Sequence, residues 1–113
     1  MTTDQEQGPY PKESIEIRGM EPIQIPIDDV LDLHTFRPKD IADLLENYFD
    51  ECIKAGIFSV RVIHGKGKGI QKRQVHRILQ NNPTVINFED APPEAGGWGA
   101  TLVQLKPPAN IID

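Results

Sequence analysis

The sequence predicts an α/β fold, a two-layer α/β sandwich in the order β-α-β-α-β-β with a mixed four-stranded sheet and two helices on one face. Short apolar runs of strand length alternate with two longer segments whose apolar residues repeat with a helical period. Prolines and glycines separate these segments. Because a strand-helix-strand connection is nearly always a right-handed crossover, the first three strands should be parallel. The fourth follows a loop without a helix, so we expect it to pair antiparallel.

The two ends of the chain are predicted to be tails around one folded domain at residues 28–107. Residues 1–27 are rich in Gln, Glu and Pro and show no sustained period, which is typical of a flexible acidic tail. Within them, residues 23–27 alternate apolar and polar side chains and suit an edge strand, because edges tolerate proline. Residues 108–113 form the second tail.

The first strand and the first helix have clear boundaries. Residues 29–34 have the pattern of a short strand, and Pro38 suits the first turn of a helix. From residue 38 to residue 55 the apolar side chains follow the i, i+3, i+4, i+7 series, and Gly56 stands where a C-terminal cap belongs. Cys52 falls on this apolar stripe, so we predict that it lies in the core.

The second half of the chain repeats the pattern. A loop punctuated by glycines at residues 64–69 precedes the second amphipathic segment, Pro83 ends that segment, and a further loop with two prolines and two adjacent glycines follows at residues 90–98. The predicted elements are a strand over 58–63, a helix over 70–81, a strand over 84–88 and a strand over 99–106.

Charge is distributed unevenly along the chain. The net charge is −5, yet residues 52–88 contain seven basic residues and no acidic one. Such a segment is typical of a phosphate-binding face, and equally of a solvated helix surface with a loop. The seven are Lys54, Arg61, Lys66, Lys68, Lys72, Arg73 and Arg77.

Three titratable side chains at predicted strand ends are the candidate catalytic residues. Asp32 and His34 project from the same face of the first strand, because strand side chains alternate, and His64 ends the second strand. Ligand crevices in open α/β sheets lie beyond the carboxyl ends of the parallel strands, where both motifs should meet. Alternatively, Asp32 is a turn or capping carboxylate and His34 a satisfied strand-end histidine.

The glycine loop is the predicted phosphate-binding element. It offers backbone without bulky side chains, N–H groups at the start of a helix and two lysines. Its spacing matches neither the P-loop nor the dinucleotide fingerprint, so no nucleotide cofactor is predicted. The alternative is a tight strand-to-helix turn. The predicted phosphate-binding residues are Gly65, Lys66, Gly67, Lys68, Gly69, Lys72, Arg73 and Arg77.

Two further side chains have a predicted place but no assigned chemistry. His76 stands between Arg73 and Arg77, so we expect it to be solvated or to be an outer nucleic-acid contact. Trp98 either stacks on a base or packs against the sheet, and packing is the favoured interpretation.

Three motifs, in this order and at these spacings, resemble the Smr (small MutS-related) domain family over residues 29–106. The motifs are Leu31-Asp32-Leu33-His34, His64-Gly65-Lys66-Gly67 and Gly96-Gly97-Trp98-Gly99-Ala100-Thr101. The resemblance implies a stand-alone Smr domain with a fold like that of the C-terminal domain of translation initiation factor three. It also implies DNA-nicking or RNA endonuclease activity, as in several members, with the Asp and His of the first motif needed for cleavage. The chain has Thr35-Phe36 where the family commonly has Gly and an apolar residue.

The function predicted from these residues is cleavage of RNA or nicking of DNA at a phosphodiester bond. His34 would act as general base or acid, Asp32 would orient it, and His64 would be a second proton-transfer group. Lys66 and the amides of Gly65 and Gly67 would stabilise charge developing on phosphorus. RNA can supply its 2′-hydroxyl as nucleophile without metal, whereas in DNA water must attack, and Asp32 could then hold Mg²⁺ or Mn²⁺. No obligatory metal or other cofactor is predicted.

Two other functions fit the same sequence. The first is a binding module that grips RNA or DNA without catalysis, and the second is an adaptor that docks on the ribosome or another protein through its N-terminal tail. The single cysteine cannot form an internal disulfide, and there is no signal peptide, lipidation motif or apolar run of membrane-spanning length. We therefore expect a cytoplasmic protein without a membrane partner.

Overall fold

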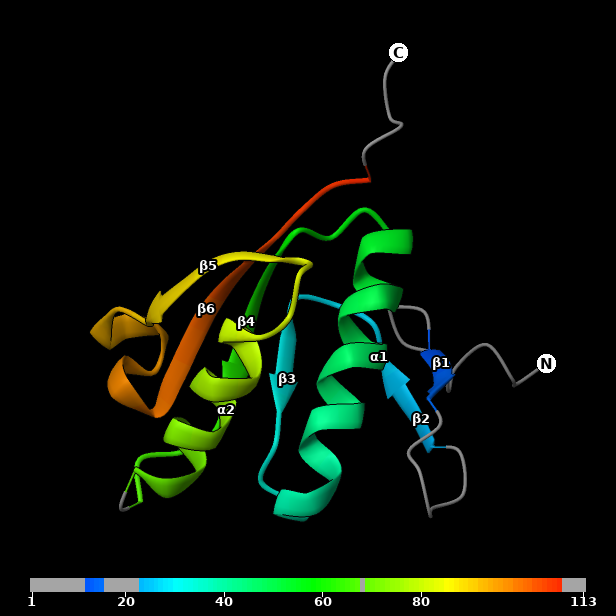
Figure 1. The fold of residues 1–113 in the computed structure, drawn as a ribbon. Helices are drawn as coiled ribbons and strands as arrows, with labels where there is room; N and C mark the ends of the chain where they lie inside the picture. Colours follow the sequence, from blue (N-terminus) through cyan, green and yellow to red (C-terminus); the bar gives the residue numbers. More distant parts are fainter. Residues whose placement is uncertain (1–11, 16–22, 68, 109–113) are drawn as a thin grey trace, which may run out of the picture.

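A four-stranded mixed sheet with two helices on one side forms the body of the protein, as predicted (Figure 1). The computed structural model describes residues 12–15, 23–67 and 69–108. The elements of the sandwich are β3 (Val30–Asp32), α1 (Ile41–Lys54), β4 (Ser59–Ile63), α2 (Ile70–Gln80), β5 (Val85–Asp90) and β6 (Ala100–Leu105). Short 3-10 turns cover Pro38–Asp40, Pro93–Ala95 and Gly97–Gly99.

The strand order in the sheet is β3-β4-β6-β5. β3 and β4 are parallel, and β6 runs antiparallel to both of its neighbours, β4 and β5. β5 therefore runs in the same direction as β3 and β4, as the crossover rule predicts. The insertion of the last strand between β4 and β5 was not predicted, because connection rules fix strand direction more firmly than strand order.

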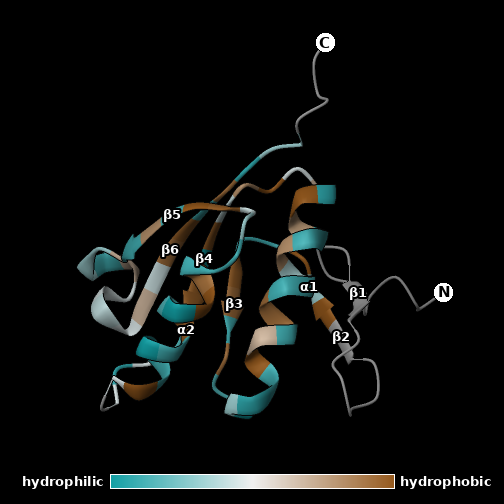
Figure 2. Ribbon diagram, viewed as in Figure 1, coloured by the Kyte–Doolittle hydropathy of each residue, from teal (hydrophilic) through white to brown (hydrophobic). Residues whose placement is uncertain are grey.

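The hydrophobic core lies between the sheet and the two helices. Figure 2 shows hydrophobic residues concentrated on the strands and α1, while α2 is largely hydrophilic. Gly56, at φ +80°, ends α1 in the left-handed conformation expected of a capping glycine. The described part of the chain contains no helix with the length and apolarity needed to cross a membrane. Fully buried core residues include Leu33, Leu44, Leu45, Phe49, Cys52, Val62, Val75 and Val103.

An N-terminal hairpin extends the folded part beyond the predicted start at residue 28. β1 (Lys12–Ile15) and β2 (Ile23–Pro26) pair antiparallel as a separate two-stranded sheet beside α1. The expected strand is present, but it pairs with β1 and not with an edge of the main sheet. Ile25 and Ile27 are buried and belong to the hydrophobic core. The rest of the predicted N-terminal tail, at 1–11 and 16–22, and the C-terminal residues 109–113 lie outside the described residues.

Candidate functional site

The carboxyl ends of β3 and β4 lie side by side, so the two motifs that follow these strands adjoin. Asp32 is paired with Ile63 across the parallel ladder, and Leu33 N–H donates to Ile63 O at 2.9 Å. His34 therefore leaves the sheet next to Gly65, with neighbouring strands about 4.8 Å apart. The first turns of both helices begin at this same end of the sheet (Figure 1).

Asp32 and His34 form an exposed carboxylate–imidazole pair. Asp32 Oδ1 lies 2.9 Å from His34 Nδ1 and accepts a hydrogen bond from the His34 backbone N–H at 3.0 Å. The backbone bond is the largest cause that lowers the pKa of Asp32, so the carboxylate stays charged. With Nδ1–H directed at Asp32, Nε2 of His34 is left as a base facing solvent, and the side chain is 75% exposed.

The turn after this pair contains the residue that departs from the family pattern. The N–H of Phe36 donates to Leu33 O at 3.0 Å, which closes a turn that holds His34 and an exposed Thr35.

Among residues 12–15, 23–67 and 69–108, no three or more His, Cys, Asp or Glu side chains form a group that could hold a metal ion.

The glycine loop between β4 and α2 is held against the late glycine motif. Gly99 O accepts hydrogen bonds from the N–H groups of His64 and Gly65 at 3.1 and 2.8 Å. The amide of Gly65 is therefore occupied, contrary to the expectation that it faces a phosphate. Lys66 is exposed, while Lys68 lies outside the described residues.

The start of α2 leaves backbone donors for an anion. Gly69 precedes α2 with φ +80° and has no side chain that could cap the first turn. The first N–H groups of a helix have no partner within it and attract anions. With Lys66 alongside, this turn keeps the features of a phosphate site even though the Gly65 amide is excluded.

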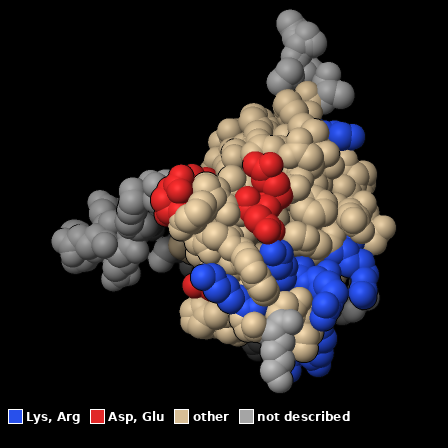
Figure 3. Space-filling model, turned by 90° about the vertical axis from the view of Figure 1, so that its left-hand side faces the viewer, with Lys and Arg blue, Asp and Glu red and all other residues tan. Residues whose placement is uncertain are grey.

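Basic side chains gather at this end of the molecule. Figure 3 shows most of the visible Lys and Arg in the lower part of the view, at the level where β3 and β4 end and α2 begins, and most of the visible Asp and Glu above them. The predicted phosphate contacts differ in their surroundings. Arg73 is exposed on the first turns of α2. Lys72 is only 18% exposed and pairs with Asp90 at 2.9 Å.

Arg77 lies further along α2 and lines a groove of about 480 Å³ between α1 and the end of α2. Glu46 and Asp50 line the opposite wall of this groove, on α1. Their negative charge makes the position less favourable to a phosphate than that of Arg73.

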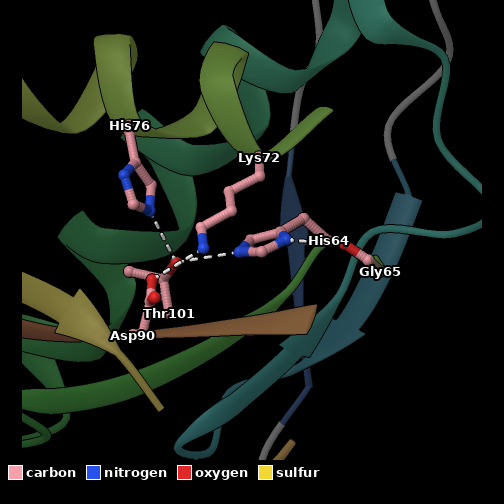
Figure 4. Close-up of polar contacts among 6 residues, drawn as sticks. All are labelled: His64, Gly65, Lys72, His76, Asp90 and Thr101. Carbon is pink, nitrogen blue, oxygen red and sulfur yellow. Dashed lines mark hydrogen bonds and ion pairs between the residues drawn. The ribbon is translucent and has the colours of Figure 1, made fainter. Parts of the chain in front are cut away.

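His64 points away from Asp32 and His34, toward the helix side of the sheet. Its buried ring lies 2.8 Å from Thr101 Oγ1 through Nε2 and 3.0 Å from Gly65 O through Nδ1 (Figure 4). Because a carbonyl only accepts, Nδ1 must carry the proton, and Nε2 then accepts from the threonine hydroxyl. Burial is the largest cause that lowers the pKa of His64, so the neutral ring is favoured.

His76 is part of the same cluster and is half-buried, so it is not simply solvated, and a contact of its ring with nucleic acid stays a prediction. Its Nε2 lies 2.9 Å from Thr101 Oγ1, and its ring packs edge-to-face on Phe88 and on His64. Since the threonine proton goes to His64, Nε2 of His76 must donate. Burial also lowers the pKa of His76.

Thr101 is the functional residue that the sequence interpretation missed. A signal was available, because alternation along the last strand places Thr101 with Val103 and Leu105 on the buried face. A buried hydroxyl in such a position needs a hydrogen-bond partner. Its two partners are the imidazole of His64, directly after β4, and that of His76 on α2, which only the tertiary structure brings together.

Trp98 does not pack into the sheet as expected. The residue is 45% exposed, and Lys72 Nζ lies 4.4 Å from the ring centroid. The ring edge approaches the glycine loop, since a Cβ placed on Gly69 would lie 3.7 Å from Trp98 Cη2. The indole is therefore a surface feature beside the start of α2.

Comparisons with known proteins agree with the fold and with the resemblance to the Smr domain. A family model described as the Smr domain matches residues 31–106. Endonuclease MutS2 of Helicobacter pylori is 39% identical over 75 residues, which is 66% of this chain and 10% of that protein. Endonuclease MutS2 of Thermomicrobium roseum is 35% identical over 80 residues, 71% of this chain and 10% of that protein. The chain thus matches about a tenth of the length of these relatives.

Two solved structures share the architecture. The crystal structure of the Smr domain of Thermus thermophilus MutS2 superposes with a TM-score of 0.66 at 30% identity, covering 71% of this chain and all of that one. The crystal structure of YdaL, a stand-alone small MutS-related protein from Escherichia coli, gives 0.64 at 26% identity, covering 69% of this chain and 64% of that one.

Proposed function

Because the chain belongs to the Smr domain family, we propose that it binds nucleic acid at the carboxyl ends of β3 and β4 and cleaves a phosphodiester bond there. The observation that carries this proposal is the exposed His34–Asp32 pair beside the Gly65–Gly69 loop. An oriented imidazole base next to an anion-binding turn is what phosphoryl chemistry requires. The relatives named endonuclease MutS2 are consistent with it.

In this proposal the role of each residue follows from the atoms that it contacts. Asp32 holds His34 with Nδ1 protonated, so Nε2 takes a proton from the nucleophile. Lys66 and the N–H groups that begin α2 stabilise the negative charge on the phosphate. His64 touches Gly65 and Thr101 instead of the exposed pair, so in this proposal it positions the loop and does not transfer a proton to substrate.

RNA suits this arrangement better than DNA. In RNA, His34 removes the proton of a 2′-hydroxyl, the 2′-oxygen bonds to phosphorus, and the bond from phosphorus to the 5′-oxygen breaks. The departing oxygen takes a proton from solvent, which leaves a cyclic phosphate. In DNA, water must attack, and Asp32 would hold Mg²⁺ or Mn²⁺ to activate it.

A cleavage assay tests the proposal directly. Labelled single-stranded and double-stranded RNA and DNA are incubated with the protein in Mg²⁺, Mn²⁺ or EDTA. We expect His34→Ala and Asp32→Asn to reduce the cleavage rate about 100-fold or more. Lys54→Ala, at the far end of α1, is the matched control and should leave the rate unchanged. Cleavage that survives His34→Ala would overturn the assignment.

A binding module without catalysis is the second candidate function. The observation that favours it is the solvent exposure of His34, because proton transfer is most effective where water is excluded. If the protein binds the labelled strands but forms no cleavage product under any of the assay conditions, its function is binding without catalysis. Docking on the ribosome or a protein through the N-terminal segment stays a prediction, since residues 1–11 and 16–22 lie outside the described residues.

A further inference from the structure

Two large apolar side chains are exposed beside the glycine loop. Trp98, in the turn Gly97–Gly99, is 45% exposed, and Ile70, the first residue of α2, is 65% exposed. Both lie at the basic end of the molecule, where a solvated surface would normally be polar. Exposed apolar groups next to a charged binding surface are typical of a contact site for a ligand with an apolar face.

The indole of Trp98 is held in place from one side. Lys72 Nζ stands 4.4 Å from the ring centroid, and the ion pair with Asp90 fixes that ammonium group. Gly69 lies against the ring edge at Cη2. Because Lys72 covers one face of the ring, the exposed area of Trp98 belongs to the rest of the indole.

The ring and the phosphate site are linked through one short turn. Gly99, the residue after Trp98, packs so closely on Lys66 that a Cβ at Gly99 would lie 3.1 Å from Lys66 Cγ. A ligand that places a phosphate at Lys66 therefore has its neighbouring groups beside the indole. In nucleic acid the flat group next to a phosphate is a base.

We propose that Trp98 is a stacking platform for an unpaired nucleobase, so that the domain selects single-stranded over double-stranded nucleic acid. This inference rests on the proposed function, because it assumes that a phosphate is held at Lys66. Every base has a π-face that can stack on indole, so the platform accepts either RNA or DNA. In a duplex both faces of each base are covered by its neighbours, which leaves none for Trp98.

The experiment uses Trp98 as its own reporter, because the chain contains one tryptophan. Short single-stranded RNA and DNA, the same strands with abasic sites throughout, and the matching duplexes are titrated into the protein. Fluorescence and an independent binding signal, such as anisotropy of the labelled strand, are recorded together. We expect single strands with bases to quench Trp98 and to bind about tenfold more tightly than abasic strands and duplexes.

Variants repeat the comparison from the protein side. Trp98→Ala should lose about tenfold in affinity for single strands but none for abasic strands, and Trp98→Phe should keep most of the affinity. Ile86→Ala is the matched control, since Ile86 is 54% exposed on β5. It should change nothing. Thermal unfolding of each variant checks that the fold is intact.

The outcomes separate the platform from the proposed function. Equal binding of base-containing and abasic strands, with unchanged fluorescence, would overturn the platform while leaving phosphate binding in place. Tighter binding of duplexes would overturn it as well. Failure of every strand to bind would instead overturn the proposed function, and the platform with it. If base-containing single strands quench Trp98 fluorescence and abasic strands do not, the result supports both the stacking platform and the proposed function.

Discussion

The hydroxyl of Thr101 donates a hydrogen bond to Nε2 of His64 across 2.8 Å, and this contact joins the late glycine motif to the glycine loop. The other ring nitrogen of His64 donates to Gly65 O, so the imidazole ties β6 to the first residue of the loop. Thr101 also accepts a hydrogen bond from His76 on α2. A single buried hydroxyl thus fixes three elements behind the exposed site.

Replacement of Thr101 by Val should destabilise the protein. Valine has the same shape but cannot donate to His64 or accept from His76, so two polar atoms in a buried cluster lose their partner. We expect the free energy of unfolding to fall by about 1–3 kcal/mol in urea denaturation. Thr101→Ser keeps the hydroxyl and should cost clearly less. Equal losses for Val and Ser would mean that the methyl group of Thr101 matters as much as its hydrogen bonds, which would contradict the prediction.

Stability should fall as the pH drops below about 6.5, the ordinary pKa of histidine. Burial is the first cause that lowers the pKa of both His64 and His76, and the charge of Lys72 lowers both further. The unfolded chain then binds protons that the folded chain does not, so the free energy of unfolding decreases from pH 6.5 down to the folded pKa values. Urea denaturation across this range measures the slope, and NMR titration measures the two pKa values directly.

His76→Gln is the control for this pH dependence. The glutamine amide can still donate to Thr101 but does not titrate, so the slope should become shallower by the share that His76 contributes. Below about pH 5 the lowered pKa of Asp32 adds a separate loss of stability of the same sign, so the comparison is made above that range. An unchanged slope in the variant would show that His76 does not contribute.

Most of the fold could be predicted because its signals are local. The helical period from residue 38 to residue 55 and the cap at Gly56 correctly predicted α1, and the second amphipathic segment, ended by Pro83, predicted α2. The crossover rule predicted the strand directions. The position of β6 between β4 and β5 depends on contacts far apart in the sequence. The hairpin of β1 and β2 was missed for the same reason, since its pairing is not visible in the pattern of either strand.

The site could be predicted only in part. Asp32 and His34 are close in sequence and the structure has them in contact, although His34 lies in the turn after β3 and not in the strand itself. His64, His76 and Thr101 come from three different elements, so neither spacing nor charge connects them. Packing of Trp98 against the sheet was the favoured expectation and is wrong, because the ring is 45% exposed and its contacts are with Lys72 and Gly69, which lie far from it in the sequence.

Replacement of Gly99 by Ala should disturb the glycine loop through one contact. The new Cβ would lie 3.1 Å from Lys66 Cγ, so the Lys66 side chain must give way by a few tenths of an ångström. We expect a loss of about 1 kcal/mol in stability and weaker binding of single-stranded nucleic acid. In the double variant with Lys66→Ala, which has no Cγ, the cost in stability of Gly99→Ala should shrink. If the losses in stability of the two single variants simply add in the double variant, the contact between Gly99 and Lys66 does not matter and the prediction is wrong.

Arg73 and Arg77 should contribute unequally to nucleic-acid binding. Arg73 is exposed near the loop, whereas Arg77 shares its groove with Glu46 and Asp50, whose negative charge repels phosphate. Each phosphate contact adds about 0.7 to the slope of log affinity against log salt for a single strand. Arg73→Ala should therefore weaken binding and reduce the slope by about 0.7, while Arg77→Ala should change it little. Each variant removes one positive charge, so the two are matched in net charge. Equal reductions of the salt slope would mean that binding depends only on the net charge of the protein. A larger effect of Arg77→Ala would mean that the nucleic acid binds in the groove between α1 and α2.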